Sequence, residues 1–413
     1  RRPPPDRQAH HRMLPPARHA RRLRGAHALT LPVRGVCTGA GRMVETRDVN
    51  RPAPTLGILG GGQLAKMTAA AARQLGCDVL VLEQPGRSLV APALEGDWND
   101  PAWTRKLAGL VDVVTLESEF VNLPALEAVP VLFPGVATMR LVQDKLLQKQ
   151  TFAGAGLPVP RFADTPTPDA VRAFGFPCVL KKRRNGYDGK GNATVRSAAE
   201  LPAAWAKLEG DRHALYAEEF CDFTMELAII ITRGRDGAVV RYPVVETVNR
   251  DHICHIVKAP HDDPRVADIA QRAVEAIDGV GSFGMELFLG RDGALMVNEI
   301  APRVHNTGHY TIEACICSQF ENHVRAVFGW PLGSPAMRAP AAVMVNLLGA
   351  ADGPGMPQGL TEALKIPNVH IHVYGKSRSV RGRKMGHVTA LGASVAEAAA
   401  AAQRAAGLIR FGA

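Results

Sequence analysis

Residues 181–191 read Lys-Lys-Arg-Arg-Asn-Gly-Tyr-Asp-Gly-Lys-Gly, four cations followed by a loop with three glycines. This stretch continues an apolar run at 178–181, which we predict to be a strand. A glycine-rich backbone can wrap a polyphosphate with its N–H groups, and lysine supplies point charge. The alternative is a flexible, solvated basic hairpin. We favour phosphate binding because Tyr187 and Asp188 lie in the loop; the Walker A spacing is absent.

Two acidic residues stand inside apolar strands further along the chain, in Gly-Met-Glu286-Leu-Phe and Val-Asn-Glu299-Ile. Arg-Asp-Gly293 between them predicts the turn of a hairpin that brings the strands side by side. Carboxylates in apolar strands are costly unless they are paired or bind metal, and hard oxygen ligands suit Mg²⁺. Asn298 adds a neutral oxygen. The sequence predicts a magnesium site, with salt bridges to Arg303 or Lys181 as the alternative.

The loop after the second of these strands concentrates Arg303, His305, Asn306 and His309. Such a loop is a usual place for a substrate anion, although a purely structural role for each residue stays open. Cations also crowd residues 376–384. That run lacks the interleaved aromatic residues of a nucleic-acid surface, which disfavours nucleic acid. We interpret it as a clamp for a monophosphate, with a solvated charge run as the alternative.

The N-terminal third begins with an apolar strand at 55–59, the turn Gly60-Gly-Gly62 and an amphipathic helix at 63–75. A second strand follows at 78–82 and a third at 111–116, which predicts a small parallel α/β domain. Gly60-x-Gly62-x-x-Ala65 with Glu83 downstream has the outline of a dinucleotide-binding fingerprint. The same turn also serves many α/β domains that bind no dinucleotide.

The remaining chain mixes strands at 178–181, 215–218, 227–231 and 239–245 with helices at 264–277 and 311–328, which predicts an α+β domain. A last segment opens with a strand at 341–347 and ends in an alanine-rich helix at 394–408. The predicted organisation is a disordered basic arm at 1–50, a Rossmann-like domain at 51–145, the α+β domain at 146–334 and a small C-terminal domain at 335–413.

Composition narrows the class of protein. The apolar runs are too short to cross a bilayer, so a membrane protein is excluded. Residues 1–42 carry ten arginines and one acid, a net +9 of the chain's +10, so residues 43–413 carry only +1 and give no case for nucleic-acid binding. The 7 cysteines are scattered without a CxxC pair, which favours free thiols in a reducing compartment. The arm lacks the serines of a transit peptide, although organellar import stays open.

Taken together, the motifs resemble the 5-(carboxyamino)imidazole ribonucleotide synthases, ATP-grasp enzymes of de novo purine synthesis. The resemblance runs from about residue 55 to the C-terminus. It is carried by Leu-Gly-Gly-Gly-Gln63-Leu, Gln-Asp-Lys145-Leu-Leu-Gln-Lys149, Asn-Gly-Tyr-Asp-Gly-Lys-Gly191, Tyr-Pro-Val-Val-Glu246, Asn-Glu-Ile-Ala-Pro-Arg-Val-His-Asn306, Ser-Gln-Phe-Glu321 and Gly-Arg-Lys-Met-Gly-His-Val388. It implies a Rossmann-like first domain that binds no NAD, a central ATP-grasp domain and a small C-terminal domain.

The resemblance also implies a reaction in which ATP, bicarbonate and 5-aminoimidazole ribonucleotide give the carbamate, ADP and phosphate through carboxyphosphate. A cytoplasmic homodimer that requires Mg²⁺ is implied as well. The alternative is a sister ATP-grasp ligase that activates formate and acts on glycinamide ribonucleotide. Some relatives carry a mutase domain; the chain ends at Ala413, so we expect a monofunctional enzyme or a fragment of a fusion.

The family's roles transfer to this chain through the matching motifs. ATP binding is implied for Lys145, Lys181, Gly186, Gly189, Lys190, Gly191, Glu218, Glu219, Phe220, Cys221, Glu226, Asn249 and Asn298, and metal binding for Glu286 and Glu299. Catalytic roles are implied for Tyr187, Asp188, Arg303, His305 and Asn306, and substrate binding for Gln63, Glu119, Lys376 and Arg383. Glu117 is an alternative to Glu119. Three places differ from the family's pattern. Asn249 stands where the family often has histidine, Asn192 where it usually has glutamine, and Ala65-Lys66 where it usually has Gly-Arg.

Overall fold

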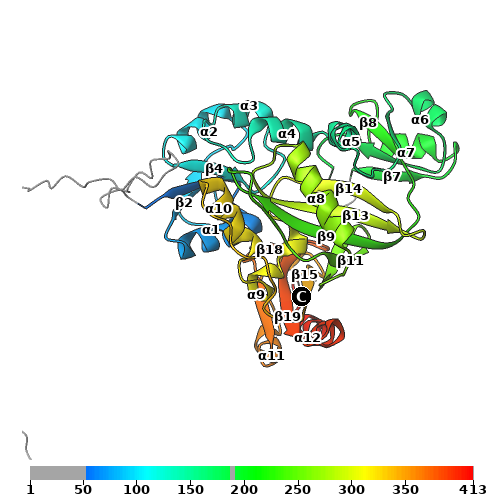
Figure 1. Ribbon diagram of the computed structural model, residues 1–413. Helices are drawn as coiled ribbons and strands as arrows, with labels where there is room; N and C mark the ends of the chain where they lie inside the picture. Colours follow the sequence, from blue (N-terminus) through cyan, green and yellow to red (C-terminus); the bar gives the residue numbers. More distant parts are fainter. Residues whose placement is uncertain (1–52, 187–190, 413) are drawn as a thin grey trace, which may run out of the picture. The chain divides into compact units, whose positions relative to one another are not determined.

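The structure, a computed structural model, describes residues 53–186 and 191–412 (Figure 1). The predicted arm at 1–50 lies outside the described residues, and so do Tyr187, Asp188, Gly189 and Lys190. Within the described ranges, three larger sheets and a two-stranded ribbon organise the chain. No helix in these ranges is long and apolar enough to cross a bilayer.

The first sheet is parallel and has the strand order β3-β2-β1-β4. Its elements are β1 (Thr55–Leu59), α1 (Gln63–Gln74), β2 (Asp78–Glu83), β3 (Ala93–Glu95), α2 (Pro101–Ala108), β4 (Val113–Leu116), α3 (Leu123–Glu127) and α4 (Val136–Gln143). Because side chains alternate along a strand, Leu56 and Ile58 pack against α1, and Leu59 packs against α2 and α3 on the other face. The predicted strand–helix–strand unit is confirmed.

The second sheet is antiparallel, in the order β5-β8-β6-β7. It is built by β5 (Phe162–Asp164), α6 (Pro168–Phe174), β6 (Cys178–Lys182), β7 (Asn192–Val195), α7 (Leu201–Lys207) and β8 (Leu215–Glu219), and follows α5 (Lys145–Gly154). It has an apolar core of its own, in which Leu180 packs with Trp205. The strands predicted at 178–181 and 215–218 are confirmed.

The third sheet has nine strands and runs through the rest of the chain in the order β14-β13-β9-β11-β12-β15-β19-β17, with β10 beside β9. The strands are β9 (Phe223–Arg233), β10 (Val239–Arg241), β11 (Val245–Arg250), β12 (Ile253–Ala259), β13 (Gly281–Gly290), β14 (Leu295–Ala301), β15 (Ala341–Leu348), β17 (Val369–Val373) and β19 (Lys384–Gly392); β16 (Gly353–Pro354) and β18 (Arg378–Ser379) form the ribbon. Because β12 pairs with β15, the segment predicted as a C-terminal domain continues this sheet.

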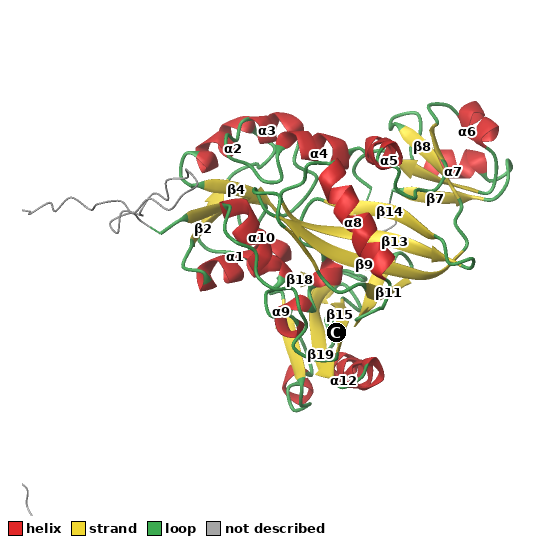
Figure 2. Ribbon diagram, in the orientation of Figure 1, coloured by secondary structure: helices red, strands yellow, loops and turns green. Residues whose placement is uncertain are grey.

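Helices cover the third sheet and link it to the first (Figure 2). They are α8 (Pro264–Ala276), the 3₁₀ turn η1 (Asn306–Gly308), α9 (Thr311–Ala314), α10 (Gln319–Phe328), α11 (Leu360–Ala363) and α12 (Val395–Leu408). α8 packs on β9 and β13, and α12 packs on β15 and β19. Val324 and Val327 of α10 complete the core of the first sheet, so a distant helix closes the Rossmann-like domain.

Two predicted elements are divided. The strand predicted at 239–245 is split into β10 and β11, because Pro243 cannot donate a ladder hydrogen bond. The helix predicted at 311–328 is split into α9 and α10. Cys315 forms a bridge with Met337, and the Ser318 hydroxyl then accepts from Glu321 N to cap a new helix.

Candidate active site

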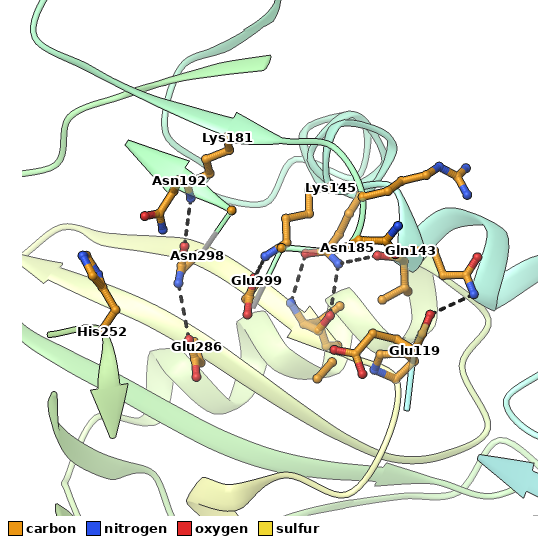
Figure 3. Close-up of a pocket in the computed structure, with 18 of the residues that line it drawn as sticks. Glu119, Gln143, Lys145, Lys181, Asn185, Asn192, His252, Glu286, Asn298 and Glu299 are labelled. Atoms are coloured by element: carbon orange, nitrogen blue, oxygen red, sulfur yellow. Dashed lines mark hydrogen bonds and ion pairs between the residues drawn. The ribbon is translucent and has the colours of Figure 1, made fainter. Parts of the chain in front are cut away.

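A cavity of about 740 Å³ is lined by residues of the second and third sheets, by the loops next to them and by residues 119–124, which follow β4 of the first sheet (Figure 3). It brings together most of the described residues expected to bind substrates. These are Glu119, Lys145, Lys181, Gly186, Gly191, Glu218, Glu219, Phe220, Cys221, Glu226, Asn249, Glu286, Asn298, Glu299, Arg303, His305 and Asn306. The cavity is therefore the candidate active site.

Three predicted substrate residues do not line this cavity: Gln63, Lys376 and Arg383. Gln63 is the first residue of α1. The Lys376 ammonium donates to the backbone oxygen of Lys384 at 2.7 Å, and the Arg383 guanidinium donates to Arg378 O at 3.0 Å. Lys384, which the sequence analysis did not single out, lines the cavity. Its position in the cation-rich run 376–384 was the sequence feature that could have identified it.

Glu286 and Glu299 face each other across the predicted hairpin. They are direct partners in the antiparallel β13–β14 pair. Burial and the charge of Glu299 raise the pKa of Glu286 to about 7. Burial also pushes the pKa of Glu299 upward, but the Lys145 ammonium outweighs it and holds that pKa at about 2. One carboxylate of the pair is thus fully ionised, and the other holds a proton readily.

The ammonium groups of two lysines lie near this carboxylate pair (Figure 3). Lys145, at the start of α5, donates to the Glu299 carboxylate. Lys181, at the end of β6, donates to Asn298 Oδ1 at 3.3 Å, and Asn298 Nδ2 donates to Glu286 at 3.4 Å. The two ammonium groups supply positive charge where the carboxylates alone would repel a polyphosphate.

The donor set at the carboxylate pair suits a hard divalent cation, since it consists of carboxylate and amide oxygens. Within residues 53–186 and 191–412, no group of three His, Cys, Asp or Glu side chains could hold a metal ion unaided. A cation here therefore needs further oxygen ligands, such as those of water or of a phosphate. This is the usual arrangement for Mg²⁺, which bridges a few carboxylates to substrate phosphates.

Glu218 is a buried counter-ion between two lysines. Its Oε2 accepts from Lys181 at 2.6 Å and its Oε1 lies 3.2 Å from Lys149 Nζ. The Tyr216 hydroxyl also donates to Oε1, at 2.8 Å. Burial would raise the pKa of Glu218, but the lysines dominate and lower it to about 2. The Glu218 side chain is thus held by Lys149, Lys181 and Tyr216 where it borders the cavity, and its place in the adenine-binding hinge stays a prediction.

The residues after Glu218 form a more open edge of the cavity. Glu219 and Phe220 are exposed, and the Cys221 thiol donates to Glu219 O at 3.7 Å. Burial raises the pKa of the Cys221 thiol, so it stays neutral. This edge offers backbone groups and an aromatic face, which suit a planar ring.

Glu226 and Asn249 form a second polar group on the neighbouring strands β9 and β11. Asn249 Nδ2 donates to Glu226 Oε2 at 2.6 Å. Burial raises the pKa of Glu226, and the Asn249 hydrogen bond opposes that rise. The amide therefore keeps a part-buried carboxylate oriented, and a neutral asparagine fulfils this task where the resembling family often has histidine.

The loop after β14 supplies the third group of side chains. Arg303 forms a two-point pair with Glu119, at 2.5 and 3.0 Å. Burial and the Arg303 charge lower the pKa of His305 to about 3, so its imidazole is neutral. Asn306 and Asn346 exchange two amide hydrogen bonds, at 2.9 and 2.6 Å. The loop thus brings a cation paired with Glu119 and neutral polar groups to this end of the cavity, a setting for a small anion.

The glycine-rich loop begins and ends at adjacent points. A Cβ at Gly191 would lie 2.4 Å from Gly186 Cα, so only glycine permits the two ends to approach. Lys182 N also donates to Gly191 O at 2.8 Å. Gly186 and Gly191, the described ends of the loop, both line the cavity.

The glycine turn of the first domain is filled by a carboxylate of the chain itself. The Glu117 carboxylate accepts from the backbone N–H groups of Gly62 and Leu64 at the start of α1. A Cβ at Gly62 would lie 2.3 Å from Glu117 Oε1. The helix N-terminus that holds a pyrophosphate in dinucleotide-binding domains is here satisfied internally. Glu119, rather than Glu117, lines the cavity.

Family models match three consecutive parts of the chain. A ribonucleotide synthetase preATP-grasp domain matches residues 53–143, an ATP-grasp domain residues 150–320, and a phosphoribosylaminoimidazole carboxylase C-terminal domain residues 342–401. These matches agree with the three-domain organisation expected from the sequence.

Among curated proteins, the N5-carboxyaminoimidazole ribonucleotide synthase of Synechococcus elongatus is 44% identical over 372 residues, which cover 85% of this chain and 93% of the relative. The phosphoribosylaminoimidazole carboxylase of Schizosaccharomyces pombe is 40% identical, and the match covers 83% of this chain and 66% of that longer protein.

A crystal structure of N5-carboxyaminoimidazole synthase from Aspergillus clavatus, in complex with ADP and 5-aminoimidazole ribonucleotide, is similar with a TM-score of 0.78 and 35% identity. The similarity covers 86% of this chain and 98% of the fungal chain. By motif order, fold and sequence similarity along most of its length, the chain belongs to the N5-carboxyaminoimidazole ribonucleotide synthase family of ATP-grasp enzymes.

Proposed function

We propose that the protein catalyses the ATP-dependent carboxylation of 5-aminoimidazole ribonucleotide by bicarbonate, with release of ADP and phosphate. The observation that carries the proposal is the meeting of three groups in one cavity. These are the facing carboxylates Glu286 and Glu299, the ammonium groups of Lys145 and Lys181, and the loop that carries Arg303. The names of the relatives favour this reaction over the formate-using alternative.

ATP is proposed to lie between the second and third sheets. Lys145 and Lys181 are suited to its phosphates, and the loop 186–191, with Gly189 and Lys190, to closing over them. Phe220 and its neighbours suit adenine, and Glu226, oriented by Asn249 at 2.6 Å, suits the ribose hydroxyls. Since Asn249 already orients Glu226, and Lys145 and Lys181 are already paired with carboxylates, little ordering cost remains to be met at these side chains on binding.

Glu286 and Glu299 are proposed to hold Mg²⁺ together with ATP oxygens. Bound Mg²⁺ supplies Lewis-acid stabilisation of the charge that develops on the transferred phosphoryl group. The chain's own residues prepare this site. Lys145 keeps Glu299 ionised, and Asn298 bridges Lys181 and Glu286, so that the charged groups keep their positions when the nucleotide leaves.

Bicarbonate and the aminoimidazole are proposed to react beside Arg303, His305 and Asn306. A bicarbonate oxygen attacks the γ-phosphorus and ADP leaves, which forms carboxyphosphate. The exocyclic amine then attacks the carbonyl carbon, phosphate leaves, and the amine loses a proton. Arg303, held by Glu119, offers a fixed cation for the anionic intermediate, and neutral His305 offers a hydrogen bond.

The ribonucleotide phosphate is proposed to bind near Lys376 and Arg383. Neither residue lines the cavity, but Lys384, whose backbone oxygen accepts from Lys376, does. Tyr187, Asp188 and Gln63 remain candidates for the same substrate. We also propose a homodimer and a cytoplasmic location; no disulfide joins the described cysteines, which suits a reducing compartment.

The proposal is tested by supplying the purified chain with Mg-ATP, 5-aminoimidazole ribonucleotide and either labelled bicarbonate or labelled formate. A parallel reaction contains glycinamide ribonucleotide in place of the aminoimidazole. Label from bicarbonate should enter the aminoimidazole nucleotide in an ATP-dependent manner. Transfer of formate to glycinamide ribonucleotide, without carboxylation, would overturn the proposal.

A further inference from the structure

The segment that carries the proposed metal and substrate residues, 299–306, begins on a strand with an open edge. β14 is the first strand of the nine-stranded sheet, so one side of its backbone has no strand partner among the residues that the structure describes. Buried backbone groups without partners are costly. Here the backbone of Pro158, whose oxygen accepts from Val297 N at 2.8 Å, and two side chains take the place of a strand. Lys149 Nζ donates to Val297 O at 2.7 Å, and Gln148 binds Ile300.

Gln148 makes a two-point pair with the backbone of Ile300, the neighbour of Glu299. Ile300 N donates to Gln148 Oε1 at 3.0 Å, and Gln148 Nε2 donates to Ile300 O at 3.1 Å. Gln148 is 2% exposed and lies on α5, the helix that begins with Lys145. An amide carries one donor group and one acceptor, so it matches a peptide unit as a second strand would.

Gln319 repeats the arrangement at the other end of the segment. His305 N donates to Gln319 Oε1 at 2.9 Å, and Gln319 Nε2 donates to His305 O at 2.7 Å. Gln319 is fully buried at the first turn of α10, where its backbone N–H donates to Thr311 Oγ1 at 3.0 Å. The helix that completes the Rossmann-like core therefore also holds the loop of the proposed substrate pocket.

Two glycines leave space for this second pair. A Cβ at Gly308 would lie 2.6 Å from Gln319 Oε1, so a larger residue would push against the amide. A Cβ at Gly284 would lie 2.3 Å from the His305 Cβ, so β13 admits the histidine only because a glycine stands there. The position of His305 thus depends on contacts on both sides.

We propose that Gln148 and Gln319 are positioning residues that fix the two ends of the segment 299–306 for the proposed reaction, on which this inference rests. Gln148 sets the end that carries Glu299, and Gln319 sets the end that carries His305 and Asn306. Both clamps are neutral amides, so they hold the backbone without adding charge beside the phosphates or the intermediate. The Ser-Gln-Phe-Glu321 motif thereby acquires a role in the active site, although Gln319 does not line the cavity.

The chain offers a matched control on the same helix. Asn322 is also fully buried and also makes a two-point pair with a backbone: its Oδ1 accepts from Gly333 N at 2.7 Å, and its Nδ2 donates to Gly333 O at 3.0 Å. Gly333 does not line the cavity. Replacing Asn322 therefore removes an equivalent clamp without touching the segment 299–306.

The experiment compares the full chain with its Gln148→Met, Gln319→Met and Asn322→Leu variants. For each, the KM values for ATP, bicarbonate and 5-aminoimidazole ribonucleotide are measured, with kcat, the melting temperature and the ADP released per ribonucleotide carboxylated. Gln319→Met should raise the KM for the ribonucleotide about 10-fold and release excess ADP, because small misplacements of reacting groups are costly. Gln148→Met should mainly lower kcat, by about 10-fold, because it acts beside Glu299.

Asn322→Leu should lose similar thermal stability yet keep its KM values and its coupling of ADP release to carboxylation. Equal kinetic changes in Gln319→Met and Asn322→Leu would overturn the proposal. If Gln319→Met does not fold, Gly308→Ala, which crowds the same amide, is judged by the same criteria. The unmodified chain separates the proposed function from the positioning role of the two glutamines. If the unmodified chain shows no ribonucleotide-stimulated turnover, the proposed function fails, whatever the variants do.

Discussion

Glu286 and Glu299 are cross-strand partners with opposite tendencies to ionise. Lys145 donates to Glu299 and holds the pKa of that residue low, whereas burial beside Glu299 raises the pKa of Glu286 to about 7. A buried pair of this kind is stable only when cations complete it. The lysines supply part of that charge, and the proposed Mg²⁺ supplies the rest.

Replacing Glu299 with glutamine should lower Mg²⁺-dependent turnover by at least ~10²-fold, because metal charge stabilisation contributes several kcal/mol. Turnover is measured as ADP release over a range of Mg²⁺ concentrations. Glu275→Gln, on the exposed side of α8, is the control and should behave as the unmodified chain does. Near-normal activity of Glu299→Gln would remove this residue from the proposed metal site.

Replacing Glu218 with glutamine should destabilise the fold by roughly 3–5 kcal/mol, since it leaves Lys149 and Lys181 without their shared buried counter-ion. The free energy of unfolding is measured in urea. Glu219→Gln changes the next residue on β8, which is exposed, and should cost little. An equal effect of the two substitutions would show that Glu218 is not the counter-ion described here.

The contribution of Glu218 should also depend on pH in a defined direction. Its pKa is lowered from 4.5 to about 2 in the folded chain, so the unfolded state binds the proton first. The stabilisation is therefore complete above pH 4.5 and is lost as the pH falls toward about 2. The difference in unfolding free energy between the unmodified chain and Glu218→Gln should shrink over this window. A constant difference would contradict the assignment.

Replacing Lys376 with alanine should mainly raise the KM for the ribonucleotide, because a charge for its phosphate is lost while the ATP site is untouched. Lys384→Ala should act in the same direction, since Lys384 lines the cavity. Steady-state kinetics with the ribonucleotide varied test both variants. The exposed Lys365, paired with Glu362, provides the control. An unchanged KM in Lys376→Ala would exclude the phosphate clamp at this residue.

Much of the fold could be predicted from the sequence, because local turn and hydrophobic patterns match the elements that form. The turn Gly60-Gly-Gly62 predicts the first strand–helix–strand unit, and two acids in apolar runs predict the β13–β14 hairpin. The boundary between α9 and α10 was missed, because helical periodicity continues past Ser318, and a β-bridge formed by Cys315 interrupts it. Such a bridge depends on Met337, which is distant in sequence.

Site residues could be predicted where a charged side chain stands in a recognisable motif. They could not be predicted where the role of a residue depends on its contacts in the folded chain. Alternation along β8 turns Glu218 inward, and only the positions of Lys149 and Lys181 show that it is a counter-ion. Gln148 and Gln319 are uncharged, so no charge pattern marks them in the sequence. Their roles depend on which backbone N–H and C=O groups lack a secondary-structure partner in the folded chain, and no local sequence pattern predicts this.

The most direct test of the central claim is ADP release by the purified chain with Mg-ATP and bicarbonate, measured with and without 5-aminoimidazole ribonucleotide. The cavity described here predicts slow release without the ribonucleotide and strong stimulation when it is added. Absence of stimulation, in protein shown to be folded and to bind ATP, would contradict the proposed substrate and leave an ATP-grasp enzyme that acts on another acceptor.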